Sequence, residues 1–362
     1  MFPVPVHRHG FMRRTPRGLL PLLSLLSVAL AHGTAAAQRP EALWYLTDRE
    51  DAVQSFLAHA DQISVVAPQA FSLDSAGVVW GSVDARVLAT ARAKGVKVIP
   101  LIVNPGFDQP MFHRVLATPE IRARAVRNIA ALCQRQRFDG IQFDFENIHV
   151  SDRDLFTAFF RETAEALHRV GCSASVAVVP RESDFPGPTS YHAWIFANWR
   201  GAYDYKALAD AGDFLSLMTY DQHTRRTPPG PVAGVPWMER VLAYVLGLGV
   251  PPQKISLGIP SYSTRWLPAY DAQRGGHVAG SGISYQQAQG LLARHQAQAV
   301  WDERQKVGFA SWENDGINEF LYLEDARSFR EKLALVPKHR LRGYSVWVLG
   351  LEDPAVWPML RE

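Results

Sequence analysis

At 362 residues the chain is long for one ordinary domain, but single α/β barrels commonly have this size. Hydrophobic residues make up 47%, charged residues 20%, and the net charge is only +3. This composition excludes a largely disordered chain and gives no sign of a nucleic-acid-binding surface. We therefore expect one large globular domain with an extensive core and no nucleic-acid partner.

The first 37 residues have the layout of a secretory signal peptide. Arg13, Arg14 and Arg17 precede an apolar run at 19–30, and the small residues at 35–37 offer a cleavage site. A membrane anchor is the alternative, but the run is shorter than the roughly 20 residues that span a bilayer. We expect export to the periplasm or the extracellular space, a mature domain at 38–362, and no membrane span after cleavage.

The chain has two cysteines, Cys133 and Cys172. In an oxidising compartment they could form a disulfide. They could equally remain two buried thiols that fill space as small apolar side chains. The sequence leaves both possibilities open.

Apolar, β-branched runs alternate along the mature chain with amphipathic stretches of helical spacing. The eight strand-like runs lie at 42–46, 63–67, 96–103, 140–145, 175–179, 214–218, 255–259 and 344–348. The helical stretches lie at 84–94, 121–135, 152–170, 237–248 and 325–335. Eight repeats predict an α/β fold, a (β/α)₈ barrel. An open doubly wound sheet is the competing fold, but no G-x-G-x-x-G turn follows the first strand.

The segment 264–323, between the seventh and eighth strands, does not fit a simple barrel. It contains a helical piece at 285–295 and strand-like pieces at 306–312 and 319–323. We expect a small inserted α+β lobe that leaves the C-terminal face of the barrel and walls one side of a cleft.

The fourth strand ends in FDGIQFDFENI, in which apolar and polar residues alternate. Since residues two apart share one face of a strand, Gln142, Asp144 and Glu146 point the same way. In a barrel, the C-terminal strand ends carry the active site. The three polar groups could serve only to hydrogen-bond one another. However, pressing two carboxylates together is costly, which favours a catalytic role.

This arrangement suggests general acid catalysis. A carboxylate two residues back raises the pKa of Glu146, which can then keep a proton near neutral pH for a leaving oxygen. Ordinary glycoside cleavage also requires a carboxylate on the other side of the sugar, about 5 Å or more away. Asp144, on the same strand, is badly placed for that task.

Residues 139–146, DGIQFDFE, resemble the D-G-x-D-x-D-x-E signature of glycoside hydrolase family 18, the chitinase-like (β/α)₈ enzymes. The resemblance covers nearly all of the mature chain and includes MTYD at 218–221, KISLGIP at 254–260 and Trp347. Within the family, the chain is most similar to the bacterial branch that includes spore-cortex N-acetylglucosaminidases. The segments that resemble this branch lie at 144–148, 220–223, 301–303 and 341–347.

The resemblance implies substrate-assisted catalysis, in which the 2-acetamido group of the sugar attacks the anomeric carbon and no enzyme nucleophile is needed. It implies that Glu146 protonates the glycosidic oxygen and later activates water. Asp144 would hold the acetamide N–H and stabilise the oxazolinium ion, and Tyr220 would hydrogen-bond the acetamide oxygen. Trp347 would form the floor of the subsite for the reacting sugar, and Asp221 would contact the hydroxyls of that sugar.

Gln142 departs from the family pattern, because many chitinases have Asp at this position. The partner of Asp144 is therefore neutral. An amide can still hydrogen-bond and orient Asp144, so we count Gln142 among the substrate-binding residues and expect activity with an altered pH optimum.

Aromatic side chains in or beside the inserted lobe are candidates for stacking on sugar rings. We expect Trp312 to bind substrate in this way, with Trp266 and Trp301 as further candidates. No cofactor or metal is expected, since Asp221 and His223 form a lone D-x-H pattern without further ligands at suitable spacing.

The predicted function is the hydrolysis of β-1,4 bonds in an N-acetylglucosamine-containing polysaccharide, peptidoglycan or chitin, by an exported monomeric glycosidase. The alternative is a catalytically silent chitin-binding barrel, against which the retention of Glu146, Asp144 and Tyr220 argues. A two-carboxylate glycosidase with its nucleophile on the seventh strand is disfavoured, because 255–259 contains no Asp or Glu.

Overall fold

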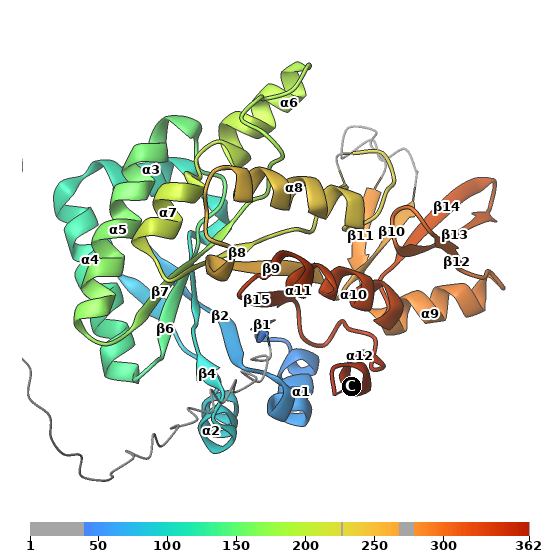
Figure 1. Ribbon diagram of the computed structural model, residues 1–362, viewed down its shortest axis with the longest axis horizontal. Coiled ribbons are helices and arrows are strands. Elements are labelled where there is room, and N and C mark those ends of the chain that lie inside the picture. Colours follow the sequence, from blue (N-terminus) through green and yellow to red (C-terminus); the bar gives the residue numbers. More distant parts are fainter. Residues whose placement is uncertain (1–39, 226, 268–278, 362) are drawn as a thin grey trace, which may run out of the picture. The chain divides into compact units, whose positions relative to one another are not determined.

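The computed structural model describes residues 40–225, 227–267 and 279–361, and the expected signal peptide lies outside them. Parallel strands form a closed eight-position barrel (Figure 1). The barrel closes because β1 (Glu41–Leu46) pairs with both β2 (Val65–Leu73) and β15 (Gly343–Trp347). The remaining positions are β4 and β5 (Lys97–Val98 and Leu101–Val103), β6 (Gly140–Asp144), β7 (Ser173–Val178), β8 (Phe214–Leu217) and β9 (Ile255–Pro260). The predicted (β/α)₈ fold is confirmed.

Six strands lie within two residues of their predicted bounds, and the other two differ more. The third is split into β4 and β5 around Pro100, since proline has no N–H to donate to a ladder. The second continues past Pro68 to Leu73 and forms an antiparallel hairpin with β3 (Val79–Gly81), which was not predicted.

The barrel helices surround the barrel (Figure 1) and bury their apolar faces against it, except α6 (Ser190–Ile195), which has no buried residue. α2 (Ala85–Lys94) matches its prediction, because Asp84 caps its first turn and Gly95, at φ 70°, ends it. No described helix is long and apolar enough to cross a membrane. The other helices are α1 (Glu50–His59), α3 (Gln109–Ala117), α4 (Pro119–Gln136), α5 (Arg153–Arg169), α6 (Ser190–Ile195), α7 (Tyr205–Ala211), α8 (Val235–Gly247), α10 (Ala326–Leu333), α11 (Leu335–His339) and α12 (Val356–Met359).

The inserted lobe lies between β9 and β15, as predicted for the seventh and eighth strands. It contains a five-stranded antiparallel sheet in the order β11-β10-β14-β13-β12 and one helix, α9 (Tyr285–Arg294). The lobe has a core of its own, which includes Trp312 and Leu321. Its strands are β10 (Ser263–Leu267), β11 (Ala279–Ile283), β12 (Val300–Asp302), β13 (Val307–Asn314) and β14 (Ile317–Leu323).

A disulfide joins Cys133, near the end of α4, to Cys172, directly before β7. Their Cα atoms are 6.6 Å apart, and the bond closes a loop with a sequence separation of 39. Of the two possibilities that the sequence left open, the structure shows the cross-link.

Replacing both cysteines by alanine should lower the free energy of unfolding by about 2–4 kcal/mol, because the unfolded chain regains the freedom of the open loop. Urea unfolding with and without a reductant measures the effect. The reductant should destabilise the unmodified protein and leave the double variant unchanged. Equal stability of the two proteins without reductant would contradict the prediction.

Candidate active site

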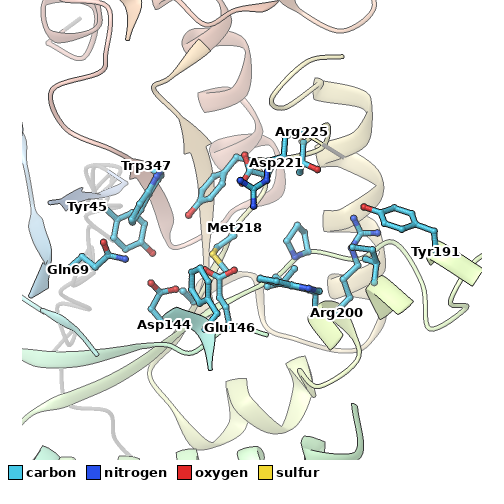
Figure 2. A pocket seen from close by; sticks show the side chains of 18 residues that line it. Tyr45, Gln69, Asp144, Glu146, Tyr191, Arg200, Met218, Asp221, Arg225 and Trp347 are labelled. Atoms are coloured by element: carbon cyan, nitrogen blue, oxygen red, sulfur yellow. The ribbon is translucent and has the colours of Figure 1, made fainter. Parts of the chain in front are cut away.

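A cavity of about 410 Å³ opens at the C-terminal ends of the barrel strands (Figure 2). Asp144, Glu146, Tyr220, Asp221 and Trp347 all line it. The structure therefore brings together five of the seven side chains predicted for the site.

The end of β6 aims the two carboxyl groups into this cavity. Asp144 is its last residue and is 5% exposed, and Glu146 follows two residues later on the same face. The Asn104 side chain holds the backbone of Glu146 by donating to its carbonyl (2.8 Å) and accepting from its N–H (3.0 Å). The Tyr203 hydroxyl donates to the carbonyl of Phe145 at 2.8 Å. The strand tip is thus fixed on both sides of the carboxyl pair.

Burial controls the charge of this pair. It raises the pKa of Glu146 well above the usual range, and the nearby charges of Asp144 and Asp221 raise it further. Burial also raises the pKa of Asp144 to about 6, against the opposing effect of a hydrogen bond from the Gln69 side chain. Near neutral pH the pair therefore keeps a proton, and Glu146 holds it. This is the charge state that a general acid requires.

Tyr220 and Asp221 follow the end of β8, which lies two strands from β6 in the barrel. Gly258 of β9 leaves space for Tyr220, since a Cβ there would lie 3.0 Å from the ring atom Cε1 and 2.4 Å from the carbonyl oxygen of Leu217. Asp221 has φ 56° and accepts a hydrogen bond from the Tyr262 hydroxyl. Such left-handed non-glycine residues are common at functional sites.

Trp347, the last residue of β15, packs against Tyr45, with ring centroids 5.4 Å apart. Figure 2 shows both rings beside Gln69 at one end of the cavity. The hydroxyl of Ser261 bonds both the N–H (2.8 Å) and the carbonyl (2.7 Å) of Val348, which fixes the chain directly after Trp347. An aromatic platform therefore lies next to the carboxyl pair.

Gln142 corrects our expectation of a substrate contact. Its side chain is fully buried, accepts from the Tyr45 hydroxyl (2.7 Å) and donates to the hydroxyls of Ser175 (3.1 Å) and Ser216 (3.2 Å). With these partners it lies in the barrel interior and not on the cavity surface. The amide that bonds Asp144 belongs to Gln69.

Trp312 also corrects our expectation. It is 8% exposed, belongs to the core of the inserted lobe and stacks on His295 with ring centroids 4.9 Å apart. Trp266 is fully buried, and Trp301 lies beneath the guanidinium of Arg327. Packing within the lobe accounts for these rings, and none of them lines the cavity.

Sequence reasoning missed Tyr45, Gln69 and Asn104. Tyr45 and Asn104 lie at or directly after the ends of apolar runs, so the rule that strand ends carry the site could have identified them. It also missed Arg200 and Arg225, which line the cavity from longer connections after β7 and β8 and have no sequence signal of their own.

Within 40–225, 227–267 and 279–361, no group of three or more His, Cys, Asp or Glu side chains is placed to hold a metal ion. The chemistry that the described cavity offers is that of its carboxyl, hydroxyl, amide, guanidinium and aromatic groups.

Asp144→Asn should stabilise the fold above pH 6. A carboxyl with a folded pKa near 6 binds more protons in the folded state, so its contribution to stability falls as the pH rises from about 4 to 6. The amide removes this loss, which amounts to about 3 kcal/mol. Urea unfolding at pH 4.5 and 7.5 measures the free energy of unfolding of both proteins. The stability of the variant relative to the unmodified protein should be greater at pH 7.5 than at pH 4.5. A difference in stability that is independent of pH would show that Asp144 is not desolvated.

Comparison with known proteins shows to which family this chain is similar. The model for glycosyl hydrolases family 18 matches residues 44–352. YdhD of Bacillus subtilis (strain 168), provisionally named a sporulation-specific glycosylase, is 31% identical over 280 residues, 76% of this chain and 63% of that protein. The cortical fragment-lytic enzyme of the same organism is 29% identical over 266 residues, 73% of this chain and 59% of the enzyme. The match thus spans about three fifths of each relative.

One solved structure is similar to this chain over almost its entire length. The chitinase from Chromobacterium violaceum ATCC 12472 superposes with a TM-score of 0.79 at 27% identity, covering 89% of this chain and 98% of the chitinase. The family match includes every residue that lines the cavity. The chain belongs to glycosyl hydrolases family 18.

Proposed function

We propose that the protein is an exported glycosidase that cleaves β-1,4 bonds in an N-acetylglucosamine-containing polysaccharide, peptidoglycan or chitin, by a retaining, substrate-assisted mechanism. The observation that carries the proposal is the pair of the buried Asp144 and the half-buried Glu146, with the proton held on Glu146. Membership of family 18 and the names of its relatives agree with a glycan as substrate.

In this mechanism Glu146 donates its proton to the glycosidic oxygen as the bond to the anomeric carbon breaks. The acetamide oxygen of the sugar that contains this anomeric carbon attacks the carbon and forms an oxazolinium ring. The deprotonated Glu146 then activates the water that opens the oxazolinium ring. Asp144 accepts a hydrogen bond from the acetamide N–H, and the negative charge of Asp144 stabilises the oxazolinium ion. Tyr220 donates to the acetamide oxygen, and Trp347 supports the sugar face.

The geometry disfavours a conventional enzyme nucleophile. Strand β9 has the sequence ISLGIP, without a carboxylate. The third carboxylate of the cavity, Asp221, is held by the Tyr262 hydroxyl and fits a contact with sugar hydroxyls. A silent sugar-binding barrel is also disfavoured, because binding alone gives no reason to keep two desolvated carboxyl groups together.

Export and a monomeric state are further parts of the proposal. The signal-like segment at 1–37 supports export. The Cys133–Cys172 disulfide is compatible with it, since such bonds persist in oxidising compartments.

Glu146→Gln should lower kcat by about 100-fold or more, since the amide keeps the size of the side chain but cannot donate the proton. Glu120→Gln, on the exposed first turn of α4, makes the same chemical substitution outside the cavity and should leave kcat unchanged. Hydrolysis of N-acetylglucosamine oligomers and of purified peptidoglycan, followed by mass spectrometry, measures both. Near-normal turnover in Glu146→Gln would exclude this residue as the acid.

The substrate's acetamide should be indispensable. A de-acetylated glycan should react hardly at all, and a thiazoline mimic of the cyclised intermediate should inhibit far more tightly than the free N-acetyl sugar. Asp144→Ala should lose that advantage, because it removes the charge opposite the cationic ring. Intact-protein mass spectrometry should detect no sugar–enzyme adduct, and such an adduct, or efficient cleavage of de-acetylated glycan, would overturn the mechanism.

A further inference from the structure

Two arginine side chains, Arg200 and Arg225, line the active-site cavity. Arg200 ends a single π-helical turn (Phe196–Arg200) after α6, and Arg225 lies in the loop after β8. Figure 2 shows Arg200 and Tyr191 on the side of Glu146 away from Trp347, and Arg225 near Asp221. Trp347 and Tyr45 therefore lie at one end of the cavity, and Arg200, with Tyr191, lies at the other.

The acidic side chains of this region are already paired with other arginines. Glu182 pairs with Arg240 at 2.5 Å, Asp184 with Arg181 at 3.1 Å, and Asp204 with Arg153 at 3.4 Å. Across the described parts of the chain, no ion pair or side-chain hydrogen bond involves the guanidinium of Arg200 or of Arg225.

An unpaired guanidinium is unusual where it is partly withdrawn from water. Arg200 is half-buried, and this burial lowers its pKa, although the more distant charge of Glu182 acts in the opposite direction. Arginine stays charged in proteins, so the cost of burial persists until an anion approaches.

The two arginines do not act as counter-ions of the carboxyl pair. The raised pKa of Glu146 is caused by burial, Asp144 and Asp221, and no cation among the described residues offsets it. The raised pKa of Asp221 is likewise opposed only by its bond to Tyr262. Within the described parts of the chain, no acidic side chain therefore serves as the partner of Arg200 or Arg225, and both remain free to bind an anion of the substrate.

We propose that Arg200 and Arg225 bind a carboxylate on the leaving-group side of the cleaved bond. The preferred substrate is then an N-acetylated glycan that carries a carboxylate next to N-acetylglucosamine, and not neutral chitin. The planar guanidinium matches a carboxylate by paired N–H···O bonds. This inference rests on the proposed function, which puts the reacting sugar on Trp347 and the leaving sugar beyond Glu146.

The carboxylate can come from a lactyl ether on the sugar or from a peptide attached to that ether. Peptidoglycan strands treated with an amidase present the free lactyl carboxylate, and untreated strands present only peptide carboxylates. Methyl esterification of either strand removes the charge with little change in shape. A neutral N-acetylglucosamine oligomer is the reference substrate.

The experiment compares kcat/KM for each free-acid strand and its methyl ester. The unmodified protein should prefer at least one free acid by about 10-fold or more, the effect expected for a charge-assisted hydrogen bond. The strand that shows the preference identifies the source of the carboxylate. Arg200→Gln and Arg225→Gln should each reduce the preference several-fold, mainly through KM. The exposed Arg225 gives a second variant if Arg200→Gln does not fold.

Arg169→Gln is the matched control, because Arg169 is exposed at the end of α5, directly before β7 and hence at the opposite face of the barrel. It removes the same charge and should retain the full preference. Equal turnover of acid and ester by the unmodified protein would overturn the carboxylate site. An equal loss of preference in Arg169→Gln would also overturn it, because the effect would then be that of net charge.

Calorimetric binding of the same strands to Glu146→Gln separates this inference from the proposed function. If Glu146→Gln binds the acid more tightly than the ester but the unmodified protein does not cleave either strand, the proposed hydrolysis is rejected and the carboxylate site is retained. Turnover that depends on Glu146, without any preference for acid, would reject only the carboxylate site.

Discussion

The desolvation of two carboxyl groups at the tip of one strand is the constraint on which the rest of the site depends. Strand alternation puts Asp144 and Glu146 on the same face, and their repulsion and desolvation would disfavour folding if both were ionised. The protein meets this cost by leaving a proton on Glu146. The same proton is the one that the proposed reaction consumes.

The surrounding residues hold the pair without neutralising it. Asn104 and Tyr203 bind the backbone at Glu146 and Phe145, and Gln69 bonds Asp144 through a neutral amide. Had an arginine or lysine occupied the position of Gln69, the pKa values of both carboxyl groups would fall and the acid would be lost. The arginines of the cavity lie away from Gln69, with Arg200 on the far side of Glu146 and Arg225 near Asp221 (Figure 2).

The sequence predicted the features that repeat or alternate. Eight apolar runs indicated the barrel, and the alternation in FDGIQFDFENI identified the carboxyl pair, because both patterns are local consequences of strand geometry. The chain past Pro68 was not predicted as strand, since β3 stabilises it through pairing that no local pattern encodes. Trp312 and Gln142 were misplaced for a similar reason, because a ring or an amide looks the same in sequence whether it faces a ligand or a buried neighbour. Arg200 and Arg225 were missed because what distinguishes them, a place in the cavity without an ion-pair partner among the described residues, exists only in three dimensions.

The most direct test of this view is the titration of Glu146 itself, followed by carbon NMR of the protein labelled at the glutamate carboxyl carbon, with Glu146→Gln to assign the signal. We predict a pKa well above the usual range of glutamate, and a lower value in Asp144→Asn, since the charge of Asp144 is one cause of the shift. An ordinary glutamate pKa that Asp144→Asn leaves unchanged would contradict the claim that burial and the neighbouring carboxylate keep the proton on Glu146.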